Sequence, residues 1–119
     1  MSSISVRGLV KKYGEFTAVH PLSFAVEPGE VLGLVGPNGA GKTSTLHCLA
    51  GISRPTDGDI VIAGHDLRAD PVAAKRALAF VPDEPQLFEY MTVDDHLAFI
   101  ARLYGVADAA QRVPPLLDE

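Results

Sequence analysis

The chain has 119 residues, enough for one small domain at most, and 47% of them are apolar, which suffices for a core. The net charge is −5, and the excess of acidic over basic residues is located after residue 82. Neither half of the chain therefore offers the basic stripe that sequence-independent nucleic-acid binding needs. The single Cys48 cannot form an internal disulfide, no apolar run approaches the roughly 20 residues of a membrane span, and residues 1–13 lack the apolar core of a signal peptide.

Two strands are expected before residue 30. Apolar residues between Ile4 and Val10 predict a first strand, which Tyr13 and Gly14 end. Residues 22–26 alternate large apolar with small side chains, which is the period of a half-buried strand. Residues 27–30, Glu-Pro-Gly-Glu, then predict a turn that leads into the next element.

Residues 36–45 contain the pattern Gly, four residues, Gly-Lys-Thr, which is typical of a phosphate-binding loop. The apolar run 31–35 predicts a buried strand before the loop, and residues 42–50 predict a helix after it, ended by Gly51. Glycines let backbone N–H groups approach phosphate oxygens, and the helix N-terminus adds partial positive charge. Lys42 adds a full charge, and the Thr43 hydroxyl is a hard ligand suited to Mg²⁺.

The other residues of this loop make the pattern more specific. Residues 36–43, Gly-Pro-Asn-Gly-Ala-Gly-Lys-Thr, resemble the Walker A motif of the ATP-binding cassette (ABC) ATPases. The resemblance implies an α/β fold, a P-loop NTPase with a RecA-like core and an N-terminal antiparallel β-layer, with ATP and Mg²⁺ as ligands. The nucleotide-binding residues that follow from it are Tyr13, Gly36, Pro37, Asn38, Gly39, Ala40, Gly41, Lys42, Thr43 and Ser44.

Tyr13 owes its expected role to this resemblance. In the family an aromatic residue in a Lys-x-Tyr-Gly-like context stacks on the adenine, and residues 11–14, Lys-Lys-Tyr-Gly, supply that context here. Stacking holds a base without demanding hydrogen bonds. Taken alone, Tyr13 would instead be read as an aromatic at a strand end that packs on the core.

The middle of the chain predicts a short strand over residues 59–63 and a short helix with Asp70 as N-cap and Pro71 at its first position. The apolar run 78–81 predicts another buried strand. Asp83 then stands where the family usually places a glutamine that reaches Mg²⁺ and the attacking water. Two interpretations of Asp83 remain open: a direct Mg²⁺ ligand and a solvated loop carboxylate.

The last segment predicts helices. Thr92 and Asp95 resemble a capping box, a stripe with helical spacing from Val93 to Tyr104 predicts core packing, and Gly105 suits the helix end. The ending Leu-Leu-Asp-Glu imitates the family's Walker B motif, but no signature motif precedes it and Pro114 and Pro115 do not suit a central strand. A helix with both prolines in its first turn is the preferred interpretation.

The resemblance implies the N-terminal part of an ABC ATP-binding domain, ending before the signature motif and Walker B. Residues 1–91 would hold the β-layer, the P-loop core and the Q-loop region, and residues 92–119 would begin the helical subdomain. ATP hydrolysis in the complete protein would drive transport, with a membrane permease and a second ATP-binding domain as partners, no direct nucleic acid, and a cytoplasmic location at the inner membrane face. The 119 residues alone are expected to be inactive.

Two rivals stay open: a soluble ABC ATPase of DNA repair or translation, and a protein that only binds nucleotide. A third, a P-loop kinase of another family, is disfavoured by Tyr13 and by the strand-turn layout before the Walker A motif. The four histidines lack metal-ligand spacing and are expected at surface or cap positions. These are His20, His47, His65 and His96.

Overall fold

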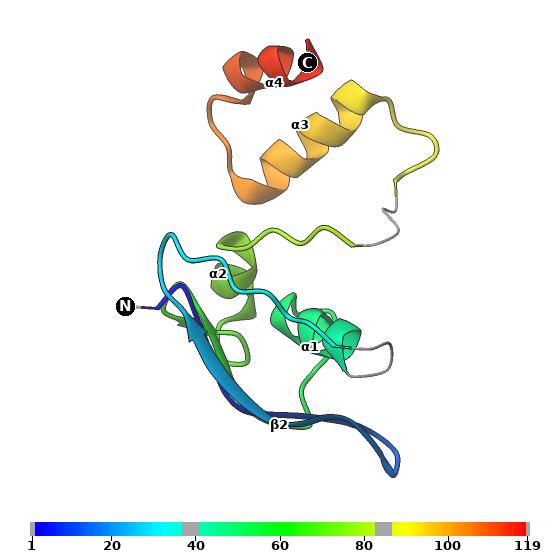
Figure 1. Cartoon of the computed structure of the whole chain (residues 1–119). Coiled ribbons are helices and arrows are strands. Elements are labelled where there is room, and N and C mark those ends of the chain that lie inside the picture. The colour runs from blue at the N-terminus through cyan, green and yellow to red at the C-terminus, as the bar shows by residue number, and fades with distance from the viewer. Residues whose placement is uncertain (1, 37–40, 83–86, 119) are drawn as a thin grey trace. The chain divides into compact units, whose positions relative to one another are not determined.

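The computed structural model describes residues 2–36, 41–82 and 87–118 (Figure 1). The chain forms two compact units, Met1–Phe80 and Val81–Glu119. The boundary expected after residue 91 stays a prediction. In the described part of the chain no helix is long and apolar enough to cross a membrane.

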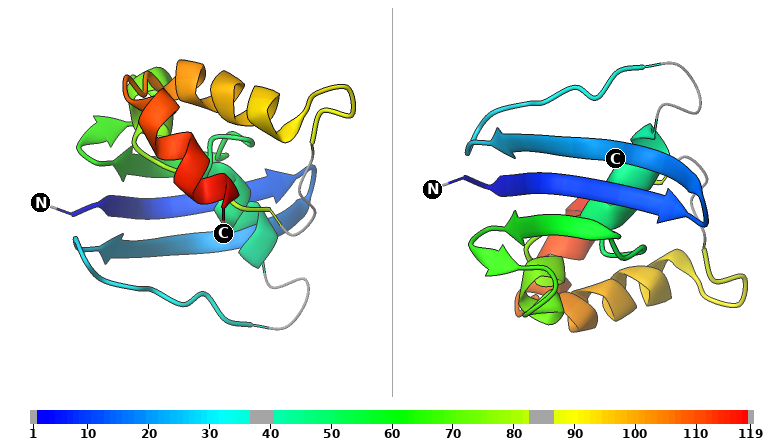
Figure 2. Two further views of the ribbon diagram at one scale, coloured as in Figure 1. Left: turned by 90° about the horizontal axis from the view of Figure 1, so that it is seen from above. Right: turned by 90° about the horizontal axis from the view of Figure 1, so that it is seen from below.

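The first unit contains a four-stranded antiparallel sheet with the order β2-β1-β3-β4, whose strands lie side by side in both views of Figure 2. The antiparallel β-layer was therefore predicted correctly, although the second strand starts earlier than residue 22. The strands are β1 (Ile4–Tyr13), β2 (Phe16–Val26), β3 (Asp57–Ile62) and β4 (His65–Asp66).

Local sequence explains the tight connection between β3 and β4. Ile62 pairs with His65, which leaves Ala63 and Gly64 as a two-residue loop. Both loop residues have positive φ, 48° and 83°. This combination matches the twist of the flanking strands, and glycine adopts it without strain.

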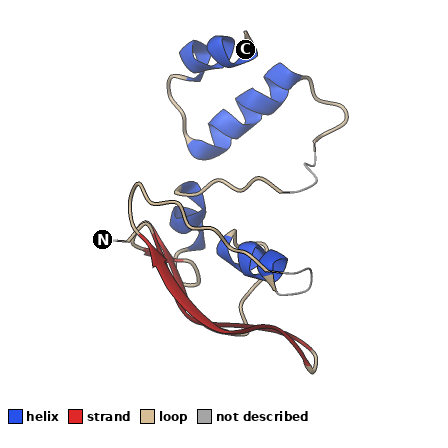
Figure 3. Cartoon of the chain, in the orientation of Figure 1, coloured by secondary structure: helices blue, strands red, loops and turns tan. Residues whose placement is uncertain are grey.

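Two helices, α1 (Lys42–Leu49) and α2 (Pro71–Arg76), pack on one face of the sheet, as the secondary-structure colours in Figure 3 show. Between sheet and helices lies a core of small and medium apolar side chains. The core residues are Val6, Leu9, Val19, Cys48, Ile60, Ile62, Leu67 and Ala74.

Asp70 caps α2 by accepting a hydrogen bond from the N–H of Ala73, so the predicted cap with Pro71 at the first helical position is confirmed.

The prediction that the apolar runs 31–35 and 78–81 form buried strands is wrong. Residues 31–35 form no strand, and Val31 and Val35 are 95% and 93% exposed. Residues 78–81 are also irregular, with Val81 exposed. A strand needs neighbours on its edges and cover on its faces. Among the described residues, no strand pairs with either run.

The second unit contains α3 (Val93–Tyr104) and α4 (Ala109–Leu117). The predicted capping box at the start of α3 is confirmed, because Thr92 accepts from the N–H of Asp95 while the Asp95 carboxylate accepts from the N–H of Thr92. Gly105 ends the helix in the left-handed conformation, as expected. The predicted core packing of α3 is wrong: no residue of this helix is buried within the described structure.

The helix expected around the two prolines exists, but it begins earlier than predicted. It starts at Ala109, so Pro114 and Pro115 lie inside α4 rather than in its first turn. A proline inside a helix removes a hydrogen bond from the preceding turn. Leu116 and Leu117 remain helical, which agrees with rejecting a Walker B strand at this point.

Candidate functional site

The N-terminus of α1 is built to present backbone N–H groups. The helix begins at Lys42 directly after Gly41, which adopts a left-handed conformation with φ 87°. No side chain caps this end among the described residues. The first N–H groups of any helix lack partners in the preceding turn and carry the positive end of the helix dipole. This end of α1 can therefore hold an anion.

Lys42 connects the two ends of the phosphate-binding loop. Its ammonium Nζ donates to the carbonyl oxygen of Gly36, the first residue of the motif. The Thr43 side chain is exposed at the same helix end. Pro37, Asn38, Gly39 and Ala40, which complete the motif, lie outside the described residues.

The opposite face of α1 anchors the helix to the sheet. Thr45 and Cys48 are buried, and the Thr45 hydroxyl donates to the Gly41 carbonyl at 2.8 Å. Burial raises the pKa of the Cys48 thiol, which keeps it neutral and inert. Leu46 is half-exposed. The sequence signal for the buried face of α1 was the pair of small side chains, Thr45 and Cys48, three residues apart.

Tyr13 lies beside the start of α1, although 31 residues separate it from Ser44. Its hydroxyl is 3.5 Å from the Ser44 hydroxyl oxygen, and half of its side chain (51%) is exposed. The Lys11 ammonium lies over the ring, 5.1 Å from its centroid. The fold therefore places the aromatic residue next to the start of α1, as an adenine platform would require.

The described residues suit a magnesium ion that arrives with phosphates. No group of three or more His, Cys, Asp and Glu side chains in this part of the chain could hold a metal alone. Mg²⁺ bound to nucleotides commonly takes only one or two protein ligands and fills its shell with phosphate and water oxygens. The exposed Thr43 hydroxyl fits such a ligand. Asp83, the second candidate, lies outside the described residues.

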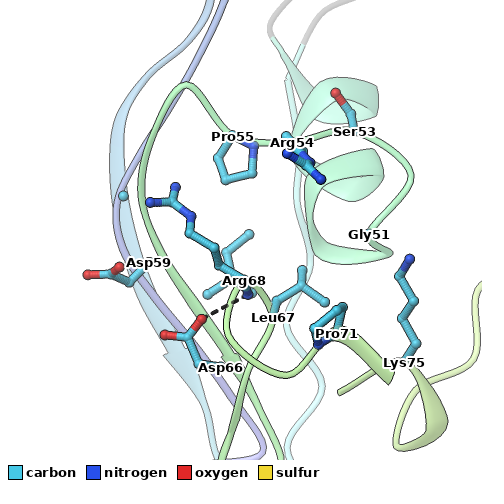
Figure 4. A pocket seen from close by; sticks show the side chains of 12 residues that line it. Gly51, Ser53, Arg54, Pro55, Asp59, Asp66, Leu67, Arg68, Pro71 and Lys75 are labelled. Atoms are coloured by element: carbon cyan, nitrogen blue, oxygen red, sulfur yellow. Dashed lines mark hydrogen bonds between the residues drawn. The ribbon is translucent and has the colours of Figure 1, made fainter. Parts of the chain in front are cut away.

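A separate pocket of about 470 Å³ is formed by residues 51–60 and 66–75, and neither Tyr13 nor Lys42 lines it (Figure 4). Asp66 accepts from the N–H groups of Arg68 at 2.8 Å and Ala69 at 3.1 Å. Both hydrogen bonds lower the pKa of the Asp66 carboxyl, and the one from Ala69 has the larger effect. The Asp66 carboxylate thus shapes the turn before α2.

Similarity to known proteins shows the family to which this chain belongs. The family model described as "ABC transporter" matches residues 19–118. The chain belongs to the ABC transporter family. Its fold is that of an ABC ATPase domain, a P-loop NTPase: a solved structure described as the ATP-binding subunit of an ABC transporter superposes with a TM-score of 0.91 and 35% identity, covering 99% of this chain and 50% of that one.

Curated ABC relatives are similar along most of the chain. The SkfA peptide export ATP-binding protein SkfE of Bacillus subtilis is 39% identical over 121 residues, 100% of this chain and 50% of that protein. The Nod factor export ATP-binding protein I of Paraburkholderia xenovorans is 44% identical over 110 residues, 91% of this chain and 36% of that protein. The chain thus spans about half of these relatives' length or less.

Proposed function

We propose that this chain is the nucleotide-binding part of the ATP-binding subunit of an ABC transporter. The observation that carries the proposal is the arrangement at the start of α1. The helix N-terminus, the Lys42 ammonium and the Tyr13 ring meet there, and they come from parts of the first unit about 30 residues apart in the sequence. Phosphates and base of one nucleotide need these three elements together.

The phosphates of ATP would bind at the N-terminus of α1. Backbone N–H groups of the loop and helix would donate to the phosphate oxygens, and Lys42 would neutralise negative charge on the outer phosphates. Thr43 would hold Mg²⁺ through its hydroxyl, and the metal would neutralise further charge. Phosphoryl transfer depends on this kind of positioning and charge neutralisation.

The adenine would stack on the exposed face of Tyr13. A stacked base contributes about 1–3 kcal/mol in single-strand binding proteins, and the interaction needs only an open aromatic face. The 3.5 Å distance between the Tyr13 and Ser44 hydroxyl oxygens supports this role, because the ring lies close to the helix that would hold the phosphates. One nucleotide could therefore reach both.

In the whole protein, ATP hydrolysis would drive transport through a membrane permease, with a second ATP-binding domain completing the assembly. The subunit would act at the cytoplasmic face of the membrane. Relatives named for peptide export and Nod factor export support transport, with export as its direction. They favour this function over that of an ATPase of DNA repair or translation.

Titration calorimetry with ATP and adenosine tests the proposal. Lys42→Ala should weaken ATP binding by about tenfold or more, because a charge-assisted contact to phosphate is lost, and should leave adenosine binding unchanged. Lys12→Ala is the matched control, since the exposed Lys12 contributes only its backbone N–H to a bond with Thr56. Equal ATP affinity in wild type and Lys42→Ala would refute the proposed phosphate site.

A further inference from the structure

We propose that Lys11 is a positioning residue for the adenine platform: it fixes the Tyr13 ring and strengthens its stacking on the base. This inference rests on the proposed function, because it takes Tyr13 as the residue that holds adenine. The Lys11 Nζ atom lies 5.1 Å from the centroid of the Tyr13 ring. Cations within about 6 Å of an aromatic face are attracted by the electrons of the ring.

The Lys11 ammonium is held in place from a second side. It donates to the main-chain carbonyl of Arg54 at 2.7 Å, and the side chain is half-buried. A free lysine side chain samples many rotamers and loses that freedom when it is ordered. Because the Arg54 carbonyl restrains Lys11, the ammonium is positioned over the ring before any ligand arrives.

The segment that carries Arg54 is itself tied to β1. The N–H of Thr56 donates to the Val10 carbonyl at 2.8 Å, and the Thr56 hydroxyl accepts from the N–H of Lys12 at 2.9 Å. These two bonds attach the loop after α1 to the residues on either side of Lys11. The position of the cation is therefore set by the main chain of two elements.

A cation on one ring face has two consequences for a base on the other. The face next to Lys11 is occupied, so adenine must use the opposite face, and the half-exposed side chain leaves room for it. The faces of aromatic rings carry negative charge, which disfavours direct face-to-face stacking. A cation draws this charge toward itself, and the opposite face becomes a better partner for the electron-rich purine.

The neighbouring Lys12 offers a matched comparison. The Lys12 side chain is exposed and makes no hydrogen bond or ring contact among the described residues. Lys12 carries the same charge as Lys11 and follows it directly in the sequence. A general attraction of basic residues for phosphate would act through both lysines. Support of the ring would act through Lys11 alone.

The test measures binding of ATP and of inorganic tripolyphosphate to the intact protein. Lys11→Met, which keeps the apolar stem, should weaken ATP binding by about two- to fivefold and leave tripolyphosphate binding unchanged. Lys12→Met should change neither, and Lys11→Arg should retain ATP affinity. In the Tyr13→Ala background, Lys11→Met should have no further effect, because the ring through which Lys11 acts is absent.

The outcomes separate this inference from the proposed function. If Tyr13→Ala does not weaken ATP binding, the adenine platform itself is wrong. If Tyr13→Ala weakens ATP binding but Lys11→Met binds ATP as wild type does, only the role of Lys11 is refuted. A Lys11→Met variant that loses tripolyphosphate and ATP together would also refute it, because Lys11 would then act through the fold of the loop.

Discussion

Gly41 and Ala18 approach each other so closely that no side chain fits between them. A β-carbon on Gly41 would collide with the carbonyl oxygen of Ala18 and lie 3.3 Å from the Val19 side chain. Gly41 also has φ 87°, in the left-handed region. Gly41, the last glycine of the loop, thus allows α1 to pack closely against β2. The fold requires a glycine here independently of any ligand.

We expect Gly41→Ala to destabilise the chain by more than about 2 kcal/mol. The left-handed conformation alone costs alanine about 1–2 kcal/mol, and the collision with a main-chain carbonyl adds to this. Gly29→Ala is the control, because Gly29 has φ 79° but open space around its α-carbon. Urea denaturation measures both variants, and equal losses of stability would show that the contact with Ala18 contributes nothing.

Cys48 should report on the opening of the first unit. Its side chain is fully buried and burial raises its pKa, so the thiolate is scarce in the folded state. Alkylation followed by mass spectrometry should therefore be slow without urea and accelerate through the unfolding transition. Alkylation of the native chain at the rate of an unfolded peptide would contradict the buried position.

The raised pKa of Cys48 also predicts the sign of a pH effect. The folded state keeps its proton above the ordinary thiol pKa of 9.0, where the unfolded chain releases it. The stabilising contribution is present below pH 9.0 and is lost as pH rises through the folded pKa. Stability should thus fall more steeply above this pH in wild type than in Cys48→Ala, which has no thiol.

The capping box of α3 should be worth about 1 kcal/mol. Thr92→Ala removes the oxygen that accepts from the Asp95 N–H, so helix content measured by circular dichroism should fall. Thr92→Ser keeps a hydroxyl at the N-cap and should preserve it. If Thr92→Ala and Thr92→Ser show the same helix content, the cap does not stabilise α3.

The features that were predictable from the sequence are those set within one turn of the chain. Asp70 before Pro71, the Thr92–Asp95 box and Gly105 each act on neighbouring backbone groups, and all three appear as expected. The phosphate-binding loop was recognisable for the same reason, since its chemistry is contained in consecutive residues.

The features that could not be predicted depend on distant partners. Residues 31–35 and 78–81 have the composition of buried strands, but composition does not supply the neighbouring strands that would pair with them. The contact between Tyr13 and Ser44 joins residues 31 positions apart. The cation over the Tyr13 ring likewise depends on the Arg54 carbonyl, which no local pattern links to Lys11.

Residues 31–35 should exchange their amide hydrogens rapidly in this 119-residue chain. Within the described residues none of them lies in a strand, and Val31 and Val35 are almost fully exposed. Val6 is the internal reference, because it is buried and pairs with both Phe24 and Ile60. Protection across residues 31–35 equal to that of Val6 would show that this run is a buried strand after all.

The most direct test of nucleotide binding at α1 is amide hydrogen exchange with and without MgATP. The N–H groups of Lys42, Thr43 and Ser44 lie at the start of α1, where the phosphates are expected. MgATP should slow their exchange in wild type, and Lys42→Ala should largely abolish the slowing at the same nucleotide concentration. Unchanged exchange at these three amides when MgATP is bound would contradict the phosphate site.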